Sequence, residues 1–226
     1  MTTRPGGRLA RRPLHFFFLV DCSGSMAFDG KIQALNTAIR EAVPHMRRAA
    51  AENASADVFV RVVRFSDGAD WHVEHPTPIE DFTWREVEAN GVTDMGDALR
   101  LVAPELEASA MPDRALPPVL VLISDGQPTD DFSGALQELL AQPWGEKSVR
   151  MAVAIGRDAD QEILQKFIAH LEYRPVSASN PEALVERIKW ASTAALKAAS
   201  SPTVGQTVSV PSPAPPAAGP DVSPVW

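Results

Sequence analysis

The sequence predicts a doubly wound, three-layer α/β domain with a mostly parallel central sheet. Short apolar runs of strand length recur along the chain, and most are apolar throughout instead of alternating with polar residues. Such runs are typical of strands covered on both faces, as in a parallel sheet between two layers of helices. Segments with apolar residues three and four positions apart, the spacing of an amphipathic helix, fill the gaps between the runs. Strand and helix therefore alternate, as they do in α/β proteins.

Four apolar runs define the predicted sheet: Leu14–Val20, Val58–Phe65, Val119–Ile123 and Val149–Ile155. Arg61 and Arg64 interrupt the second run, so we expect that strand to lie nearer an edge of the sheet. A further segment, Ala69–Val73, is expected to pair with it as a hairpin across Ser66-Asp67-Gly68.

Five helices are expected between and after these strands. The first carries an apolar stripe from Ile32 to Met46, and Pro44 is expected to kink or end it because proline lacks an amide donor. The second covers roughly 95–106, with Asp94 as its N-cap. The last has the clearest start signal, because Asn180 and Pro181 occupy the cap and first helical positions. A third, shorter helix is expected after Thr129-Asp130-Asp131, from Leu136, Leu139 and Leu140. A fourth is expected over Ile163–Ile168.

The chain divides into three parts by composition. Residues 1–12 carry four arginines and no acid, and we interpret them as a basic flexible leader. A signal peptide is the weaker alternative, because the apolar run that follows has only seven residues and no small-residue cleavage pattern. The α/β domain is expected over 13–199. Residues 200–226 hold seven of the twenty prolines and one charge, Asp221, so we expect a Pro-rich disordered tail.

Composition and charge exclude several functional classes. A formal net charge of −8 argues against a nucleic-acid binder, which needs a basic surface, and against electrostatic attachment to anionic membranes. The single cysteine, Cys22, cannot close an intrachain disulfide, and it fits a reducing compartment. No apolar run reaches the about 20 residues that a membrane-spanning helix needs. We therefore expect a cytoplasmic protein with neither nucleic acid nor membrane as partner.

Oxygen-bearing side chains follow two of the predicted strands directly. Asp21 opens Asp-Cys-Ser-Gly-Ser-Met after the first run, and side chains alternate in an extended segment, so Asp21, Ser23 and Ser25 can converge while Cys22 points elsewhere. Asp125 follows the run Val119–Ile123 and Ser124. Ligands of open α/β sheets bind beyond the carboxyl ends of the strands. The two carboxylates are thus expected to meet on one edge.

Gathering carboxylates at one edge favours a bound cation. Each close pair of like charges costs about 1 kcal/mol even in bulk water, and a cation relieves that repulsion. Carboxylate and hydroxyl oxygens select hard ions, here Mg²⁺ or Mn²⁺ over zinc. Further acids are candidates for the same edge, although each of them can equally cap a helix or solvate a loop: Asp29, Asp94, Asp97, Asp130 and Asp131.

Three segments with oxygen-bearing side chains follow one another along the chain: Asp21-Cys22-Ser23-Gly24-Ser25-Met26, the threonine-bearing segment 91–99 and the aspartate-bearing segment 124–130. In type and order they resemble the three motifs of von Willebrand factor A (VWA) domains with a metal-ion-dependent adhesion site. Within the family the chain most resembles the bacterial tellurium-resistance (TerY-type) proteins, through segments 124–131 and 188–192. The resemblance implies a Rossmann-like fold.

The resemblance also implies a role for each residue of the site. Ser23, Ser25 and Thr93 are expected to supply hydroxyl oxygens to the ion, and Asp21 and Asp125 to act through bound waters. One coordination position is left for a carboxylate of a partner protein. The implied function is a non-enzymatic, metal-dependent protein-binding module, a scaffold in a bacterial tellurium-resistance or stress-response complex. Such systems also imply an associated kinase and phosphatase.

A metal-dependent phosphohydrolase is the alternative. The three motifs contain no histidine that would act as a base, and Phe28 stands where a Cys-x5-Arg phosphatase loop would have its arginine. No phosphate-binding Gly-x4-Gly-Lys loop is present either. His72 and His75 are expected to be exposed residues of an edge strand, and Trp84 and Trp144 either pack locally or anchor a partner. Ser209–Pro216 is either an inert tail or an extended docking segment.

Overall fold

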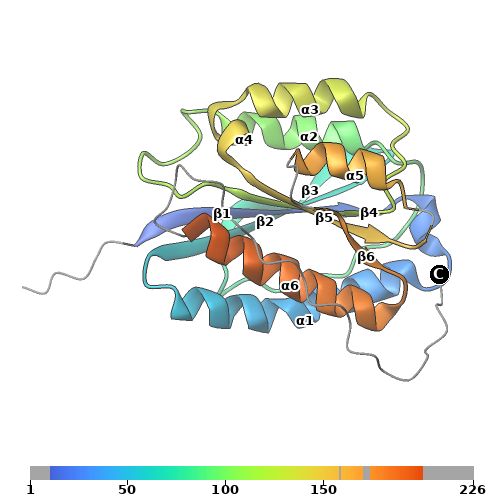
Figure 1. The fold of residues 1–226 in the computed structure, drawn as a ribbon, viewed down its shortest axis with the longest axis horizontal. Helices are drawn as coiled ribbons and strands as arrows, with labels where there is room; N and C mark the ends of the chain where they lie inside the picture. Colours follow the sequence, from blue (N-terminus) through green and yellow to red (C-terminus); the bar gives the residue numbers. More distant parts are fainter. Residues whose placement is uncertain (1–10, 158, 170–173, 201–226) are drawn as a thin grey trace, which may run out of the picture.

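A six-stranded sheet runs through the centre of the computed structural model, which describes residues 11–157, 159–169 and 174–200 (Figure 1). The order of the strands is β3-β2-β1-β4-β5-β6. Their bounds are Arg12–Asp21 (β1), Ala56–Ser66 (β2), Gly68–Pro78 (β3), Val119–Ser124 (β4), Val149–Ile155 (β5) and Val176–Ala178 (β6). The predicted leader, residues 1–12, and the predicted tail, residues 200–226, lie largely outside the described residues. At their described ends the structure differs from the prediction, because Arg12 begins β1 and Ser200 ends α6.

The mostly parallel sheet that the sequence predicts is confirmed. β1 lies in the middle and pairs in parallel with β2 and β4, while β5 and β6 continue the parallel arrangement. Among the six described strands, β3 alone runs antiparallel, as the outer strand of the expected hairpin, with Ser66 opposite Gly68 across the turn. Gly68 has a φ of 76°, in the left-handed region that glycine adopts without a steric penalty. β2 therefore lies next to the edge, as its two arginines suggested.

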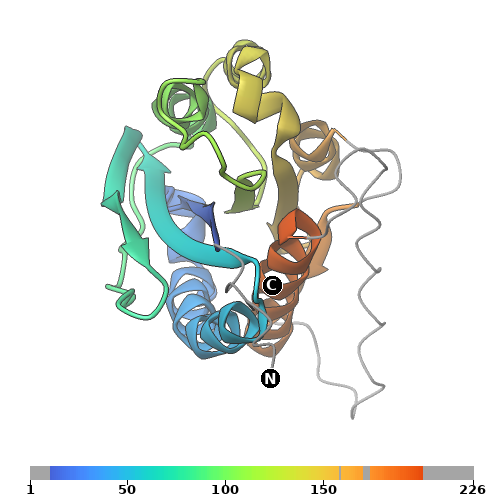
Figure 2. The same cartoon turned by 90° about the vertical axis from the view of Figure 1, so that its left-hand side faces the viewer.

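Helices cover both faces of the sheet, giving three layers (Figures 1 and 2). One face carries α1 (Lys31–Glu52) and α6 (Pro181–Ser200), which pack against each other. The other carries α2 (Met95–Val102), α3 (Phe132–Ala141) and α5 (Gln161–Ile168). Short helical segments connect these elements: η1 (Gly24–Ala27), η2 (Ala103–Leu106) and α4 (Pro143–Lys147). Within the described ranges, no helix combines the length and the apolar character needed to cross a membrane.

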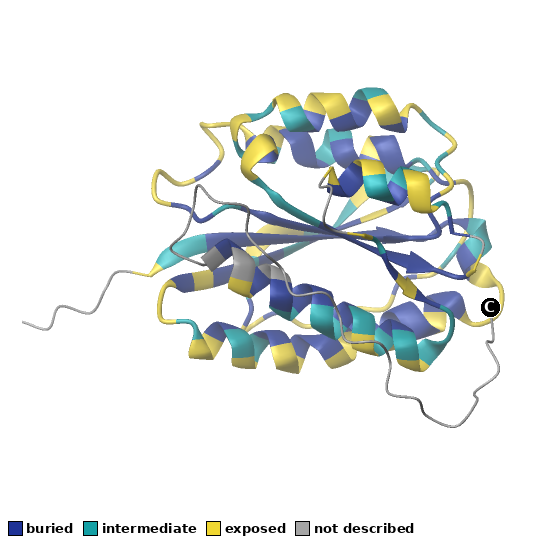
Figure 3. Cartoon of the chain, in the orientation of Figure 1, coloured by how far each residue is buried: buried dark blue, intermediate teal, exposed yellow. Residues whose placement is uncertain are grey.

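The uninterrupted apolar run of β1 is explained by burial on both sides (Figure 3). Leu14, Phe16, Phe18 and Val20 pack in the core under α1 and α6, whereas Phe17 and Leu19 pack in the core under α2, α3 and α5. β4 divides its residues between the two cores in the same way. A strand buried on both faces needs apolar side chains at every position, so its sequence does not alternate.

The expectation that Pro44 ends or kinks the first helix fails in one respect, because α1 continues through Pro44 to Glu52. Tertiary contacts hold the additional turns in place. Met46 and Ala50 are buried in the core, and the Arg47 guanidinium donates hydrogen bonds to the carbonyls of Ile79 and Phe82. These contacts offset the hydrogen bond that proline cannot donate.

Asn180 caps α6 as predicted, since its side-chain oxygen accepts a hydrogen bond from the Ala183 amide at 2.7 Å.

β6 and α4 were not predicted. β6 has three residues and α4 has five, so neither is long enough to show a periodic apolar pattern.

His15 is a buried, titratable residue of β1. Its ring stacks on Phe17 and Phe59, with centroids 6.5 and 5.8 Å away, and only 7% of its surface is exposed. Burial lowers the pKa of His15 from 6.5 to about 4, and the nearby Arg61 guanidinium lowers the pKa further while Glu105 opposes it. The folded protein therefore keeps His15 neutral at pH values where the unfolded chain protonates it.

We predict that this difference makes the fold sensitive to mild acid. Between the pKa of the folded state and that of the unfolded chain, only the unfolded chain takes up the proton, so stability falls as the pH is lowered. Between pH 7 and pH 5 the loss from His15 is about 2 kcal/mol, at about 1.4 kcal/mol per pH unit. Urea unfolding at both pH values should show a weaker loss in His15→Leu. His45→Leu, at an exposed position of α1, should match the wild type; equal losses in all three proteins would contradict the prediction.

Candidate metal-binding site

Three loops from distant parts of the sequence meet at the carboxyl edge of the sheet. The first follows β1, the second precedes α2, and the third follows β4. The Gly24 amide donates to the Gly91 carbonyl at 2.9 Å and joins the first loop to the second. The Thr129 amide donates to the Thr93 carbonyl at 2.9 Å and joins the second to the third. These bonds bring the loops with the predicted motifs together.

Asp21 is the most deeply buried polar residue of the first loop, with none of its surface exposed. Its carboxylate accepts hydrogen bonds from the Ser23 amide at 2.8 Å and from the Ser124 hydroxyl at 2.5 Å. Burial raises the pKa of Asp21 to about 6; the bonds from Ser124 and Ser23 oppose that rise, and the charge of Asp125 adds to it. A cation beside Asp21 would favour the charged carboxylate and reverse this effect.

Ser124 has a role in the site that was not predicted from the sequence. Val20 of β1 pairs with Ile123 of β4, so the next residues along, Asp21 and Ser124, end the two strands side by side. Ser124 also accepts a hydrogen bond from the Gly126 amide at 2.8 Å, which shapes the third loop. The signal available in the sequence was that both residues directly follow an apolar run.

Ser23 and Ser25 converge as expected. Their hydroxyl oxygens are 2.9 Å apart and share a hydrogen bond, and Ser23 is buried while Ser25 is partly exposed. Cys22, between Asp21 and Ser23, packs in the core under α1 and α6, and burial raises the pKa of its thiol to about 12. The thiol is therefore directed away from these hydroxyl groups and kept protonated, as the alternation of side chains predicts.

Asp125 presents a buried oxygen without a partner. The residue is 3% exposed, and its Oδ1 has no hydrogen-bond partner among the described residues. Its backbone carbonyl accepts a hydrogen bond from the Asp160 amide at 2.7 Å, which fixes the start of the third loop. An unpaired buried carboxylate oxygen is energetically costly, because it has lost water and gained nothing in return. A cation bound at this oxygen would remove that cost.

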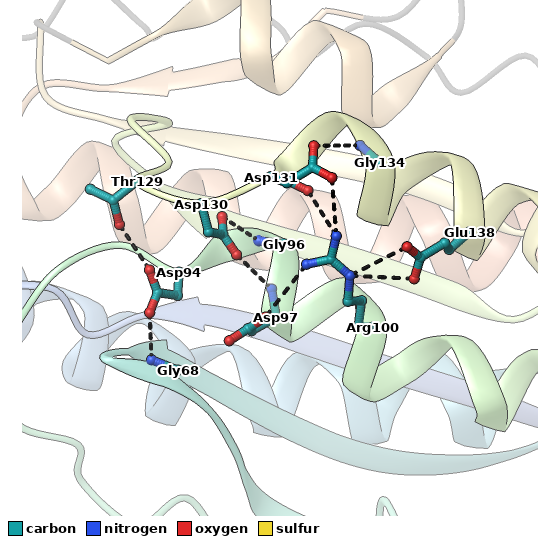
Figure 4. Close-up of polar contacts among 10 residues, drawn as sticks. All are labelled: Gly68, Asp94, Gly96, Asp97, Arg100, Thr129, Asp130, Asp131, Gly134 and Glu138. Atoms are coloured by element: carbon teal, nitrogen blue, oxygen red, sulfur yellow. Dashed lines mark hydrogen bonds and ion pairs between the residues drawn. The ribbon is translucent and has the colours of Figure 1, made fainter.

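Thr93 is held in the second loop by the third. It is buried, and its amide donates to the Thr129 hydroxyl at 3.1 Å. That hydroxyl in turn donates to Asp94, which also accepts a hydrogen bond from the Gly68 amide at 2.8 Å (Figure 4). Thr129 and Asp94 therefore fix the backbone at Thr93.

Asp94 does not cap α2 as expected. It occupies the N-cap position, but its carboxylate bonds to Gly68 and Thr129 instead. Asp130, from the third loop, supplies the missing acceptor through hydrogen bonds from the amides of Gly96 and Asp97 at 2.9 and 2.8 Å (Figure 4). The prediction from local sequence failed because a tertiary contact caps α2, through a residue that is distant in the sequence.

The additional acids serve mainly to hold the loops and helices in place. Asp131 caps α3 by accepting a hydrogen bond from the Gly134 amide, and it pairs with Arg100 at 3.2 Å. Asp97 and Glu138 also pair with Arg100, so one guanidinium links α2 to α3 (Figure 4). Their carboxylates already have partners, which supports the cap and loop alternative for Asp94, Asp97, Asp130 and Asp131.

The residues of the candidate site fit a hard divalent cation. Within the described residues, no group of three or more His, Cys, Asp or Glu side chains is arranged to hold a metal. The predicted donors are instead two carboxylates and three hydroxyls: Asp21, Ser23, Ser25, Thr93 and Asp125. Oxygen donors of this kind suit Mg²⁺ or Mn²⁺ and not zinc. The unpartnered oxygen of Asp125 is the feature that a cation explains best.

His72 of β3 and Trp84, which follows β3, have structural roles, whereas His75 is exposed as expected. The His72 ring packs 5.1 Å from the Trp84 ring and bonds through Nε2 with the Arg85 carbonyl at 2.9 Å. Trp84 is buried and donates to the Asn36 side chain at 2.9 Å. Trp84 therefore packs in the core, and His72 is only partly exposed instead of lying free on the edge.

A doubly wound sheet with helices on both faces and oxygen-bearing loops at its carboxyl edge defines a three-layer α/β domain of the Rossmann-like class. The chain belongs to the von Willebrand factor type A domain family, whose model matches residues 16–187. This confirms the family and fold that the three motifs predicted. A comparison with curated protein sequences gives no significant match.

Solved structures share the fold at low sequence identity. A von Willebrand factor type A protein from Catenulispora acidiphila is 19% identical with a TM-score of 0.64, over 82% of this chain and 43% of its own. The ArnB paralog VWA2 from Sulfolobus acidocaldarius is 17% identical with a TM-score of 0.59, over 78% and 44%. Manganese-loaded TRAP protein from Plasmodium vivax is 14% identical with a TM-score of 0.54, over 79% and 74%. This chain spans less than half the length of the first two proteins.

The contact between Asp130 and α2 gives a testable prediction about stability. Asp130→Ala leaves the amides of Gly96 and Asp97 without their acceptor, so the free energy of unfolding should fall by about 1–2 kcal/mol. Urea denaturation measures this loss. Asp113→Ala, at an exposed position before β4, is the matched control and should change stability by less than about 0.5 kcal/mol. If Asp130→Ala unfolds with the same free energy as the wild type, the third loop does not cap α2.

Proposed function

We propose that this protein is a non-enzymatic, divalent-metal-dependent protein-binding module that grips a carboxylate of a partner at a bound Mg²⁺ or Mn²⁺. The observation that carries the proposal is the buried, unpartnered oxygen of Asp125 beside Asp21, at the edge where three loops meet. Membership of the VWA family and the manganese-loaded state named for the Plasmodium vivax TRAP structure support it.

The chemistry of the donors explains how such a module would select its partner. Hydroxyl groups of Ser23, Ser25 and Thr93 would contact the ion without neutralising it, whereas the carboxylates of Asp21 and Asp125 would balance part of its charge. The ion would then retain a strong attraction for one additional anionic ligand. An Asp or Glu side chain of a partner protein supplies that ligand, and charge-assisted contacts of this type are stronger than neutral ones.

The proposal predicts that divalent cations stabilise the fold. At a hundredfold excess of Mg²⁺ or Mn²⁺ over the dissociation constant, the gain should be about 2.7 kcal/mol, because the ion binds only the folded state. Thermal melts with and without EDTA measure it. Asp125→Ala and Ser23→Ala should each abolish the response while leaving the protein folded.

The control for this experiment is Asp97→Ala, which removes an exposed carboxylate of α2 that lies outside the predicted donor set. It should retain the full response to metal. If the melting temperature of the wild type stays unchanged with either cation up to millimolar concentrations, the proposed site is excluded.

A metal-dependent phosphohydrolase is the alternative from another functional class. Hydrolysis needs a base or nucleophile beside the ion. The buried Cys22 thiol, with its pKa raised to about 12, is unsuited to that role. We predict no Mn²⁺-dependent turnover of generic phosphoesters such as p-nitrophenyl phosphate. Turnover that disappears in Asp21→Ala would favour the alternative.

The narrower proposal is a cytoplasmic scaffold of a bacterial tellurium-resistance or stress-response complex. It rests on the resemblance of segments 124–131 and 188–192 alone. A pull-down from native lysate with Mg²⁺, repeated with EDTA and with Asp125→Ala, tests it. Recovery of a kinase and a phosphatase in the Mg²⁺ sample alone would support this assignment, and metal-independent recovery would oppose it.

A further inference from the structure

Two exposed apolar side chains lie on the loops of the candidate site. Phe28 is 68% exposed and Val92 is 46% exposed, and they are the large hydrophobic residues most open to solvent in the part of the chain that the structure describes. Phe28 follows η1 directly, three positions after Ser25, and Val92 immediately precedes Thr93. The bond between Gly24 and Gly91 holds their two loops together. Large apolar side chains that are open to solvent on the loops of a candidate site are available to contact a ligand bound between those loops.

The charges around these residues restrict what can bind there. Asp29 and Asp67 are exposed neighbours of the same loops, and Asp67 accepts a hydrogen bond from the Val92 amide at 2.9 Å. A strongly acidic ligand would be repelled by them. The surface therefore suits a segment with one carboxylate for the ion, apolar residues beside it, and no other negative charge.

The chain contains a segment with these properties. Residues 201–226 carry a single charged side chain, Asp221, between Pro220 and Val222 in Gly-Pro-Asp-Val-Ser-Pro-Val-Trp. The segment follows α6. This helix begins at Pro181, three residues beyond the end of β6 at the carboxyl edge, and runs back to the opposite edge (Figure 1). Over 20 residues α6 spans about 30 Å at about 1.5 Å per residue, so Asp221 would have to return over that distance.

The intervening chain is long enough for this return. The 21 residues from 201 to 221 would reach about 65 Å as a polyproline II helix, at about 3.1 Å per residue. A random coil of this length would have a root-mean-square span of about 25 Å, and prolines extend a chain beyond that value, so the span covers the distance required. When the average span of a linker matches the separation, the effective concentration of the tethered group is of the order of millimolar.

We infer that the segment around Asp221 binds in cis to the surface formed by Phe28 and Val92, with the Asp221 carboxylate at the metal position that a partner would use. This inference rests on the proposed function, because it needs a bound cation. The tail then competes with external ligands, and a partner must displace it.

Nuclear magnetic resonance of the full chain tests the inference. Mn²⁺ at the site accelerates relaxation of nearby nuclei, with Mg²⁺ as the diamagnetic reference. We expect the amides of Gly219, Asp221 and Val222 to broaden by more than about twofold with Mn²⁺, because a tethered ligand at millimolar effective concentration occupies the site often. Asp221→Asn should lose the broadening, whereas the charge-matched Asp113→Asn should keep it.

Further measurements separate the possible outcomes. Phe28→Ser with Val92→Ser should reduce the broadening and leave the Mn²⁺ affinity, measured by calorimetry, unchanged. If Mn²⁺ binds and the amides do not broaden, the tail inference is wrong and the proposed function stands. If Mn²⁺ does not bind, the proposed function is wrong, and the tail inference is wrong with it. A mixture of labelled Asp125→Ala with unlabelled wild type should show no broadening, since broadening there would mean binding between copies.

Discussion

The structure of the site depends on one electrostatic constraint: two carboxylates, Asp21 and Asp125, are buried next to each other where two central strands end. One of them is partly satisfied, because Ser23 and Ser124 donate to Asp21. The other, Asp125, keeps an oxygen that has no partner in the part of the chain that the structure describes. Such an arrangement is unfavourable in the absence of a cation, since burial and repulsion both oppose two negative charges. This unfavourable arrangement lies at the edge of the sheet where a bound cation would offset its free-energy cost.

The rest of the edge is organised to hold these groups. The loops cap one another, because Asp130 from the third loop binds the first amides of α2 and Thr129 supports both Thr93 and Asp94. Arg100 of α2 then ties this helix to α3 through Asp131 and Glu138. Polar groups that satisfy each other across loops fix the backbone near Thr93 without using the side chain of any predicted donor. Preorganisation of this type reduces the conformational entropy that binding would otherwise cost.

Sequence reasoning recovered the parts of the fold that have a strong local signal. The β1 and β5 runs are buried on both faces, and the Ser66-Asp67-Gly68 turn joins β2 to β3. It failed where long-range contacts overrode local preference. α1 passes through Pro44 because the turns beyond it are buried and bonded to the segment that follows β3. Asp94 has the residue type and position of an N-cap, yet nearby loops offer it better partners.

By itself, the sequence determined which strands are buried and which residues carry oxygen donors at their ends, because apolar runs and the alternation of side chains are local properties. It also placed Cys22 away from Ser23 and Ser25. Only the tertiary structure decided that Ser124 holds Asp21, that Asp130 caps α2, and that Asp125 keeps an unpartnered oxygen. These facts depend on the register of β1 with β4 and on contacts between loops. Residues about 100 positions apart in the chain meet there for reasons that no local pattern encodes.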